Sequence, residues 1–367
     1  MECRYFGKCG SCTLYDMRYE AQVSYKKQMI STLFESLHVK NFDYFTSAST
    51  HYRSRAEFRI WKEADTLSYA MGSIDKKSTI CIDHCPKVEK CIDELMAPLL
   101  KALEAEAILR ERIFAVEFLA SSEALLVTLI YHKPLDETWQ NAAKILEQQF
   151  NIAVIGRSRG IKRVLSQDYV EERFEIKGET YRYRILEGGF SQPNRAMNQN
   201  MLNWTLGHLS DCEDLLELYC GYGNFTIPLS RKFKKVLATE ISKTSIKSAL
   251  INCELNNVTN IAFLRMSAEE LTSALNHERA FNRLKEVDLD AYRFSHVFVD
   301  PPRSGMDEKS LVFISRFENI IYISCNPHTL KRDLEILSNA YTIEHFALFD
   351  QFPHTEHVES GVILKRR

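Results

Sequence analysis

The sequence predicts an α/β protein whose C-terminal part, residues 191–367, forms a doubly wound, mostly parallel sheet. Two observations support this fold class. Short apolar runs alternate regularly with helical stretches from Pro193 onward. Several of these runs also end in glycine or an acidic residue, as strands do where ligands bind at the carboxyl edge of such a sheet. Residues 51–190 lack strong parallel-sheet signals and predict an α+β region. Residues 1–50 predict a cysteine-rich segment followed by a helix.

Composition and charge restrict the class of protein. The 367 residues are 45% hydrophobic and 26% charged, which is ordinary for globular domains. The net charge of −2 excludes a uniformly basic protein, so any affinity for nucleic acid must come from local patches. Because no apolar stretch reaches membrane-spanning length and the start has no apolar signal core, we expect a cytoplasmic protein with no membrane partner.

The ten cysteines are unevenly distributed. In a cytoplasmic protein, cysteines favour metal-binding, catalytic or buried roles over disulfides. Three thiols within the first twelve residues suit iron–sulfur or zinc coordination, and iron–sulfur clusters usually need four. Cys81 and Cys91 compete with Cys85 for the fourth position, and an incidental group of cysteines at a frayed terminus is the alternative. The predicted ligands are Cys3, Cys9, Cys12 and Cys85.

In the first half, hydrophobic spacing predicts several elements. Helices are expected over 22–37, 86–110 and 136–150, and strands over 114–120, 125–131 and 152–155. The stretch 52–61 alternates like a half-exposed strand with arginines beside aromatics. This pattern suits an RNA-contacting surface, or simply an amphipathic strand with a solvated face. The basic stretch 157–163 is either a phosphate contact or a solvated turn.

In the second half, the same reasoning predicts a regular alternation of elements. The expected helices are 194–209, 242–256, 268 to about 277 and 327–339, with further helical stretches after residues 225 and 307. The expected strands are 215–220, 236–240, 261–266, 296–300, 320–324, 344–349 and 359–364.

Three strand ends carry residues suited to a nucleoside ligand. The strand 215–220 ends in Gly221-x-Gly223, which lets backbone approach a ligand closely. Glu240, about twenty residues later, is placed to accept hydrogen bonds from ribose hydroxyls, and Asp300 ends a further strand. Since no third glycine follows in register, an adenosine ligand without pyrophosphate fits best. The sequence therefore predicts S-adenosylmethionine.

Cys325 follows the strand 320–324 and precedes a helix start. Asn326 is a good N-cap and Pro327 a good first helical residue. A helix N-terminus lowers the pKa of a nearby thiol, so we expect Cys325 to be available as a nucleophilic thiolate. The alternative is a buried cysteine acting as a small hydrophobe. Glu359 begins the last predicted strand, where it either reaches the same pocket or is solvated.

Taken together, these motifs resemble those of the bacterial tRNA (uracil-5-)-methyltransferases. The resemblance covers nearly the whole chain beyond about residue 50. It is carried by the segments 51–61, 167–169, 190–194, 217–225, 238–241, 299–305, 322–327 and 349–353.

The resemblance implies a Rossmann-like methyltransferase domain and a tRNA partner, contacted through its T-arm. The activity it implies is methylation at C5 of a T-loop uridine to give 5-methyluridine, with S-adenosylmethionine as methyl donor. Cys325 matches the nucleophile that adds to C6, and Glu359 matches the proton acceptor. The residues expected at the cofactor are Gln192, Tyr219, Gly221, Asn224, Glu240 and Asp300.

The N-terminal cysteine motif instead resembles that of the iron–sulfur members of the family that act on ribosomal RNA. It implies a [4Fe-4S] cluster and leaves ribosomal RNA open as a substrate. A non-catalytic RNA-binding or RNA-folding module is a further alternative. The motifs in the body of the chain favour tRNA, and we expect a monomer.

Overall fold

The larger of the two main sheets confirms the predicted fold class. The computed structural model describes residues 2–276, 278–279, 281–285 and 287–367. Eight strands lie in the order β1-β16-β17-β15-β14-β11-β12-β13, and β17 alone runs antiparallel to its neighbours. Their bounds are β1 Asp43–Phe45, β11 Asp214–Leu218, β12 Lys235–Thr239, β13 Ile261–Leu264, β14 Phe294–Val299, β15 Asn319–Ser324, β16 Tyr341–Phe349 and β17 Glu359–Arg366.

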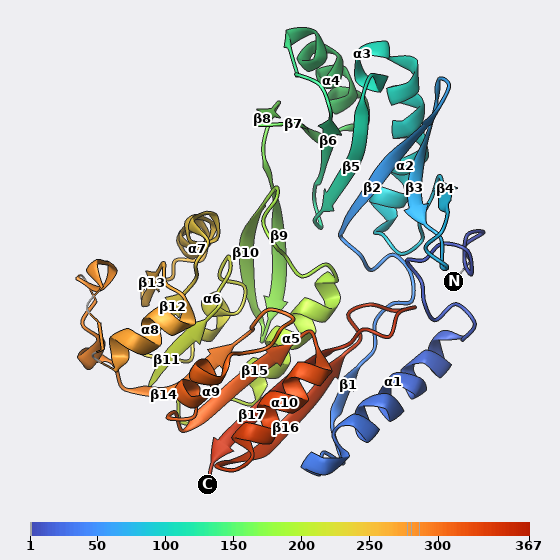
Figure 1. Ribbon diagram of the computed structural model, residues 1–367. Coiled ribbons are helices and arrows are strands. Elements are labelled where there is room, and N and C mark those ends of the chain that lie inside the picture. Colours follow the sequence, from blue (N-terminus) through green and yellow to red (C-terminus); the bar gives the residue numbers. More distant parts are fainter. Residues whose placement is uncertain (1, 277, 280, 286) are drawn as a thin grey trace.

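Helices cover both faces of this sheet (Figure 1). Neighbouring residues of β11, Leu215 and Leu216, belong to two different hydrophobic cores, so both faces are buried. A strand buried on both faces reads as a continuous apolar run, which is why the pattern was visible in the sequence. The helices are α5 Arg195–Gly207, α6 Thr226–Leu229, α7 Lys243–Leu255, α8 Ala268–Leu275, α9 Glu308–Ile314 and α10 Pro327–Leu337. Residue 277, the expected end of α8, lies outside the described residues.

The second sheet has seven strands in the order β4-β3-β2-β5-β6-β7-β8, with β6 and β7 its only parallel pair. Helices α2 (Lys90–Ala105) and α4 (Glu137–Phe150) bury Ile92 and Trp139 in its core, and α3 spans Ala107–Arg110. The strands are β2 Arg55–Glu63, β3 Thr66–Gly72, β4 Thr79–Ile82, β5 Ile113–Ala120, β6 Leu125–Tyr131, β7 Ala153–Ser158 and β8 Ile161–Val164. This α+β architecture agrees with the prediction.

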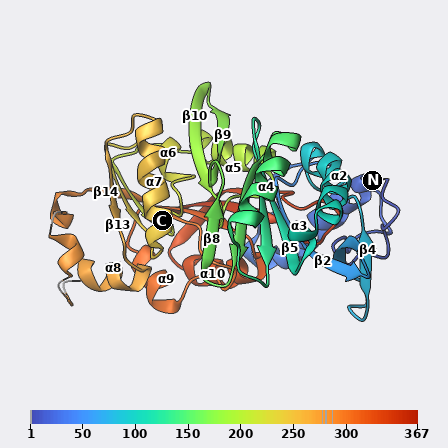
Figure 2. The same cartoon turned by 90° about the horizontal axis from the view of Figure 1, so that it is seen from above.

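A hairpin of β9 (Tyr169–Ile176) and β10 (Glu179–Leu186) lies between the two sheets (Figures 1 and 2). The sequence analysis missed it. On its α7 side, Asn252 and Asn256 accept the backbone N–H groups of Arg184 and Arg182 at 2.7 and 2.9 Å. Side-chain amides thus satisfy backbone groups that a further strand would otherwise pair.

The first fifty residues join the larger sheet directly. Helix α1 spans Tyr19–Leu33, starting earlier than expected, and a short 3-10 turn, η1, covers Glu35–Leu37. Strand β1 then pairs in parallel with β16 at the sheet edge. Two more 3-10 turns, η2 Asn282–Leu284 and η3 Leu289–Ala291, complete the elements. Within the described ranges, every helix is too short or too polar to cross a bilayer.

Candidate functional site

A cavity of about 690 Å³ opens beyond the carboxyl ends of β11, β12, β14 and β15. This is the edge at which ligands bind in open α/β sheets. All eight residues predicted for the cofactor and the chemistry line it: Gln192, Tyr219, Gly221, Asn224, Glu240, Asp300, Cys325 and Glu359. The topology of the sheet therefore brings together residues from six separate stretches of the chain.

The turn after β11 exposes backbone to this cavity. Tyr219, Gly221 and Gly223 all adopt the left-handed conformation, with φ of 65°, 55° and 87°. For the non-glycine Tyr219 this is an uncommon, strained conformation of the kind found at functional sites. A Cβ atom placed on Gly221 would meet nothing within 4 Å, so the glycine leaves open space for a ligand.

Glu240 ties the turn to the next strand. Its Oε2 accepts the N–H of Gly221 at 3.1 Å, and its Oε1 accepts the N–H of Ser242, the N-cap of α7, at 2.7 Å. A carboxylate can accept about four hydrogen bonds, so capacity for ligand hydroxyls remains.

Two of the predicted cofactor residues also have partners within the protein. Asn224 exchanges hydrogen bonds with Asn198 at 2.8 and 2.9 Å, which engages both ends of its amide. Gln192 accepts a hydrogen bond from Gln351 at 2.6 Å, and its own amide N–H groups have no acceptor among the residues that the structure describes. Gln192 is thus the better placed of the two to donate to a ligand.

Buried carboxyl groups meet at the cavity wall. Burial, and then the charge of Glu359, raise the pKa of Asp300 to about 8. Burial raises the pKa of Glu217 well above its usual value, and Asp300 adds to the effect. Glu217 Oε2 and Ser191 Oγ are buried and have no hydrogen-bond partner in the described part of the chain. Since such atoms are rare in native structures, they mark positions where a polar ligand group would be accommodated.

The expectation of a thiol activated by the helix start is wrong in its net direction. Cys325 does lie between β15 and α10, and Asn326 caps the helix by accepting the N–H of His328 at 3.1 Å. However, burial, followed by the charges of Glu359 and Asp300, raises the pKa of Cys325 to about 11. The positive charge of Arg303 opposes this shift only in part. The thiol is therefore protonated at neutral pH, and its proton must be lost before the sulfur can act as a nucleophile.

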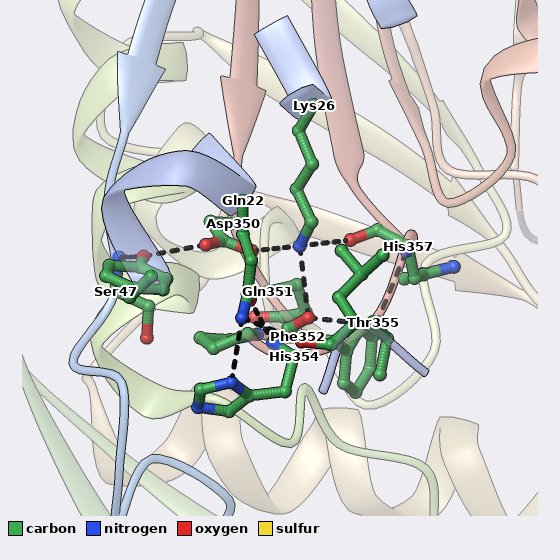
Figure 3. A network of polar contacts seen from close by, with 12 residues as sticks. Gln22, Lys26, Ser47, Asp350, Gln351, Phe352, His354, Thr355 and His357 are labelled. Atoms are coloured by element: carbon green, nitrogen blue, oxygen red, sulfur yellow. Dashed lines mark hydrogen bonds and ion pairs between the residues drawn. The ribbon is translucent and has the colours of Figure 1, made fainter. Parts of the chain in front are cut away.

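The loop 350–358, which precedes Glu359, is held by a buried ion pair (Figure 3). Lys26 Nζ lies 2.6 Å from Asp350 Oδ1, and both side chains are fully buried. Lys26 also donates to the carbonyls of Phe352 and His357 at 3.1 and 3.2 Å. Tyr19 donates to the other oxygen of Asp350 at 2.6 Å.

A second set of contacts fixes the middle of the same loop. Gln22 accepts the backbone N–H of His354 at 2.8 Å and donates toward its Nδ1 at 3.1 Å (Figure 3). Tyr52 donates to the carbonyl of Pro353 at 2.9 Å. The loop is thus held by groups from α1 and from the segment before β2.

Comparison with known proteins identifies the family. The sequence model of the tRNA (uracil-5-)-methyltransferases matches residues 18–367. The chain belongs to this family. A tRNA/tmRNA (uracil-C(5))-methyltransferase of Sulfurovum sp. (strain NBC37-1) is 51% identical, covering all of both chains. A protein of the same name from Neisseria meningitidis serogroup C is 50% identical, covering 95% of this chain and 97% of its own length.

A solved structure supports the fold. The Pyrococcus abyssi tRNA (uracil-54, C5)-methyltransferase, in complex with S-adenosyl-L-homocysteine, has a TM-score of 0.75 and 22% identity. The match covers 96% of this chain and 85% of that one. At this identity the likeness shows a shared Rossmann-like methyltransferase fold.

The N-terminal cysteines lie outside the family's sequence model, which begins at residue 18. Burial raises the pKa of Cys12 to about 12, and the charges of Cys85, Cys9 and Cys3 add to it, so these four thiols are neighbours. Yet within the part of the chain that the structure describes, no three His, Cys, Asp or Glu side chains are arranged to hold a metal. The competing Cys81 and Cys91 are exposed.

In the arginine- and aromatic-rich stretch 52–61, one arginine faces the cavity as an RNA contact would, and another also pairs within the sheet. Arg53 and Arg55 line the cavity, and the Arg53 guanidinium lies 5.4 Å from the centre of the Phe352 ring. Arg55 pairs with Glu117. The basic stretch 157–163 is partly neutralised, because Arg157 and Lys162 pair with Glu187.

Arg303 and His357 are cavity residues to which the sequence analysis gave no role. Arg303 could have been found from its place directly after the Asp300-Pro301-Pro302 motif. His357 gives no such signal, because a histidine two residues before a strand is common on protein surfaces. Its significance comes from the contact with Glu359 described below.

Proposed function

We propose that this protein transfers a methyl group from S-adenosylmethionine to C5 of a uridine in the T-loop of tRNA, giving 5-methyluridine. The target would be position 54, the position named for the Pyrococcus abyssi relative. The observation that carries the proposal is the single cavity shared by Cys325, Glu359 and the open turn at Gly221. It supplies a nucleophile, a base and a cofactor cradle together.

The cavity fits the proposed cofactor. The open side of Gly221 gives backbone access, and the Glu240 carboxylate suits ribose hydroxyls. Gln192, Tyr219, Asn224 and Asp300 would complete the binding site. When bound, S-adenosylmethionine supplies an electrophilic methyl group on a sulfonium.

The remaining chemistry belongs to Cys325 and the uracil ring. Uracil C5 is too weak a nucleophile to accept a methyl group directly. The thiol must first lose its proton to solvent, and the positive charge of Arg303, which lowers the pKa of Cys325, favours the thiolate. The thiolate adds to C6, and the resulting enolate makes C5 nucleophilic. After C5 has gained the methyl group, Glu359 takes the C5 proton and the thiolate leaves.

The target base must leave its stack to enter the cavity. Arg53 and Arg303 line the cavity. Their positive charges would bind the phosphates on either side of a flipped nucleotide. Phe190, 71% exposed, lies at the cavity and offers a ring for stacking. We therefore expect the T-arm of tRNA to unfold locally on binding.

A single assay tests the reaction and its substrate. Wild-type protein is incubated with a T-loop hairpin, or with a ribosomal-RNA fragment, in which 5-fluorouridine replaces the target uridine. We expect a denaturation-resistant adduct with the T-loop hairpin that Cys325→Ala abolishes and the distant control Cys212→Ala retains. An adduct that survives Cys325→Ala would contradict the proposed nucleophile. Adduct formation only with the ribosomal fragment would favour the ribosomal-RNA alternative, and tRNA binding without methylation would favour a non-catalytic module.

The iron–sulfur cluster is a separate proposal. It is supported by the proximity of four thiols, Cys3, Cys9, Cys12 and Cys85, whose charges affect one another. Since the described side chains are not arranged for metal, cluster assembly would have to draw the thiols together, and zinc is the alternative occupant. The monomeric state, the cytoplasmic location and the domain boundaries at residues 50 and 190 remain predictions.

A further inference from the structure

His357 lies beside the proposed base, with its Nε2 atom facing the Glu359 carboxylate. Its Nε2 is 3.5 Å from Oε1 of Glu359, too far for a strong hydrogen bond but close enough for a short approach. The same nitrogen is buried and has no hydrogen-bond partner among the described residues. The ring packs edge-on to Phe352 at 4.8 Å between centroids. Buried polar atoms without a hydrogen bond are rare in native proteins, so this imidazole nitrogen calls for a functional explanation.

The position of His357 between two cavities suggests that reason. It lines the main cavity, and it also lines a second one of about 480 Å³. The two cavities share four wall residues: Arg53, Arg303, Phe352 and His357. Glu359 is only 5% exposed, so cofactor and target nucleotide in the main cavity would remove its remaining contact with solvent. His357 is then the titratable side chain shared by the walls of both cavities.

The backbone of His357 is held in place, which keeps the ring in this wall. Lys26 donates to its carbonyl at 3.2 Å, and its own N–H donates to Thr355 Oγ1 at 3.3 Å. Figure 3 shows the carbonyl facing Lys26 and the ring pointing away from that network. The Lys26–Asp350 pair thus fixes the position from which the ring reaches Glu359.

We propose that His357 is a proton relay that acts through Glu359, an inference that rests on the proposed function. In the last chemical step, the C5–H bond breaks and its proton goes to the Glu359 carboxylate. The electron pair of that bond forms the C5–C6 double bond, and the C6–S bond breaks to return a thiolate to Cys325. The Glu359 carboxylic acid then gives its proton to the Nε2 lone pair of His357. This transfer restores the Glu359 carboxylate. The imidazolium then loses a proton to water in the second cavity, and proton exchange with that water returns a neutral ring with a lone pair on Nε2 for the next turnover.

The relay predicts a specific kinetic pattern. In the first turnover Glu359 begins as a carboxylate, so His357→Ala should form the first equivalent of 5-methyluridine at the wild-type rate. Steady-state turnover should then be about 10²-fold slower, in the range of a lost proton-transfer group. Added imidazole, which can enter the space left beside the second cavity, should restore turnover. The readout is rapid-quench measurement of 5-methyluridine in a T-loop hairpin, with and without imidazole.

His345→Ala, which removes an exposed histidine from β16, is the matched control and should show neither effect. His357→Gln, which keeps most of the side-chain volume, should be slow in steady state because an amide cannot carry the proton. Wild-type turnover in either His357 variant overturns the relay. So does a first turnover slowed as much as the steady state, with no response to imidazole. The proposed function itself fails if wild-type protein makes no 5-methyluridine, a separate outcome that removes the relay with it.

Discussion

Lys26 and Asp350 form a fully buried ion pair at 2.6 Å between residues 324 positions apart. Burial lowers the pKa of Lys26, while the charge of Asp350 opposes that shift. The pair and its hydrogen bonds join α1 to the loop that ends at Glu359. A charged residue near the start of the chain thereby helps to shape the cavity wall at Glu359.

Replacing one partner of this pair should be strongly destabilising. Lys26→Met leaves Asp350 charged and buried, and we expect unfolding free energy to fall by about 3–5 kcal/mol. The double variant Lys26→Met/Asp350→Asn removes the stranded charge and should recover part of that loss. Urea denaturation followed by circular dichroism measures both. Lys27→Met, at the exposed neighbouring position, should have little effect, and an equal loss there would contradict the assignment.

Arg303 should set the reactivity of Cys325. Its positive charge lowers the pKa of a thiol that burial and two carboxylates raise to about 11. Arg303→Gln removes that charge, so the thiolate fraction below pH 9 should fall and alkylation of Cys325 should slow by about tenfold. Mass spectrometry of the Cys325 peptide after timed iodoacetamide treatment gives the rate. Lys309→Gln, an exposed change, is the control and should leave the rate unaltered.

Asp300→Asn should stabilise the fold at neutral pH. An ordinary aspartate has a pKa of 3.8, whereas that of Asp300 is raised to about 8, mainly by burial. Between these values the folded protein holds a proton that the unfolded chain has released. The contribution of Asp300 to stability therefore falls as pH rises from 4 to 8, by about 1.4 kcal/mol per pH unit.

Asparagine cannot ionise, so the Tm advantage of Asp300→Asn over wild type should grow from pH 5 to pH 8 and then level off. Scanning calorimetry across that range, with the exposed Asp290→Asn as control, measures the difference. A Tm difference independent of pH would show that Asp300 is ionised in the folded protein. Methylation should fall in the same variant, because Asp300 lines the cofactor cavity.

Glu240→Gln should weaken cofactor binding without unfolding the protein. The substitution removes the charged acceptor but keeps the size of the side chain. Because a hydrogen bond to a charged group contributes about 1.5–3 kcal/mol, the affinity for the cofactor should fall by about 10- to 100-fold. Isothermal titration with S-adenosylmethionine measures Kd, and Glu254→Gln on the exposed face of α7 is the control. Unchanged affinity would move the ribose site away from the end of β12.

Cys85→Ser separates the candidate cluster ligands. If Cys85 is the fourth ligand, anaerobically prepared protein should lose the iron content and visible absorbance of the wild type, whereas the exposed Cys81→Ser should keep both. Loss of iron with Cys81→Ser, but not with Cys85→Ser, would reverse the assignment. Zinc without iron in the wild type would replace the cluster altogether.

Much of the fold could be predicted because a strand buried on both faces of its sheet has an unbroken run of apolar residues, as in Ile320–Ile323. The cavity residues were predictable for a related reason, since Gly221, Glu240 and Asp300 each end such a run. The β9–β10 hairpin was missed because alternating charged residues, such as Glu171 and Arg173, resemble exposed loop. Lys26 was missed because burial of a lysine depends on a partner that no local pattern reveals.

The same limit applies to the chemistry of Cys325. Its place at a helix start can be read locally, and that local rule predicts a lowered pKa. Asp300 and Glu359 come from other strands, so the opposing effect of their charges appears only after the sheet has assembled. The direction of the pKa shift of Cys325 therefore depends on the tertiary structure and not on the local sequence.

Strand β1 has a consequence for the order in which the molecule is built. It pairs with β16, whose residues are synthesised some three hundred positions later. During translation, the segment from α1 to β1 must therefore wait without its partner while both large sheets form around it. Contacts of such long sequence separation form late and slowly. On the ribosome, a nascent chain would complete the wall around Glu359 only after its earliest and latest segments had met, so methylating activity should appear last in its folding.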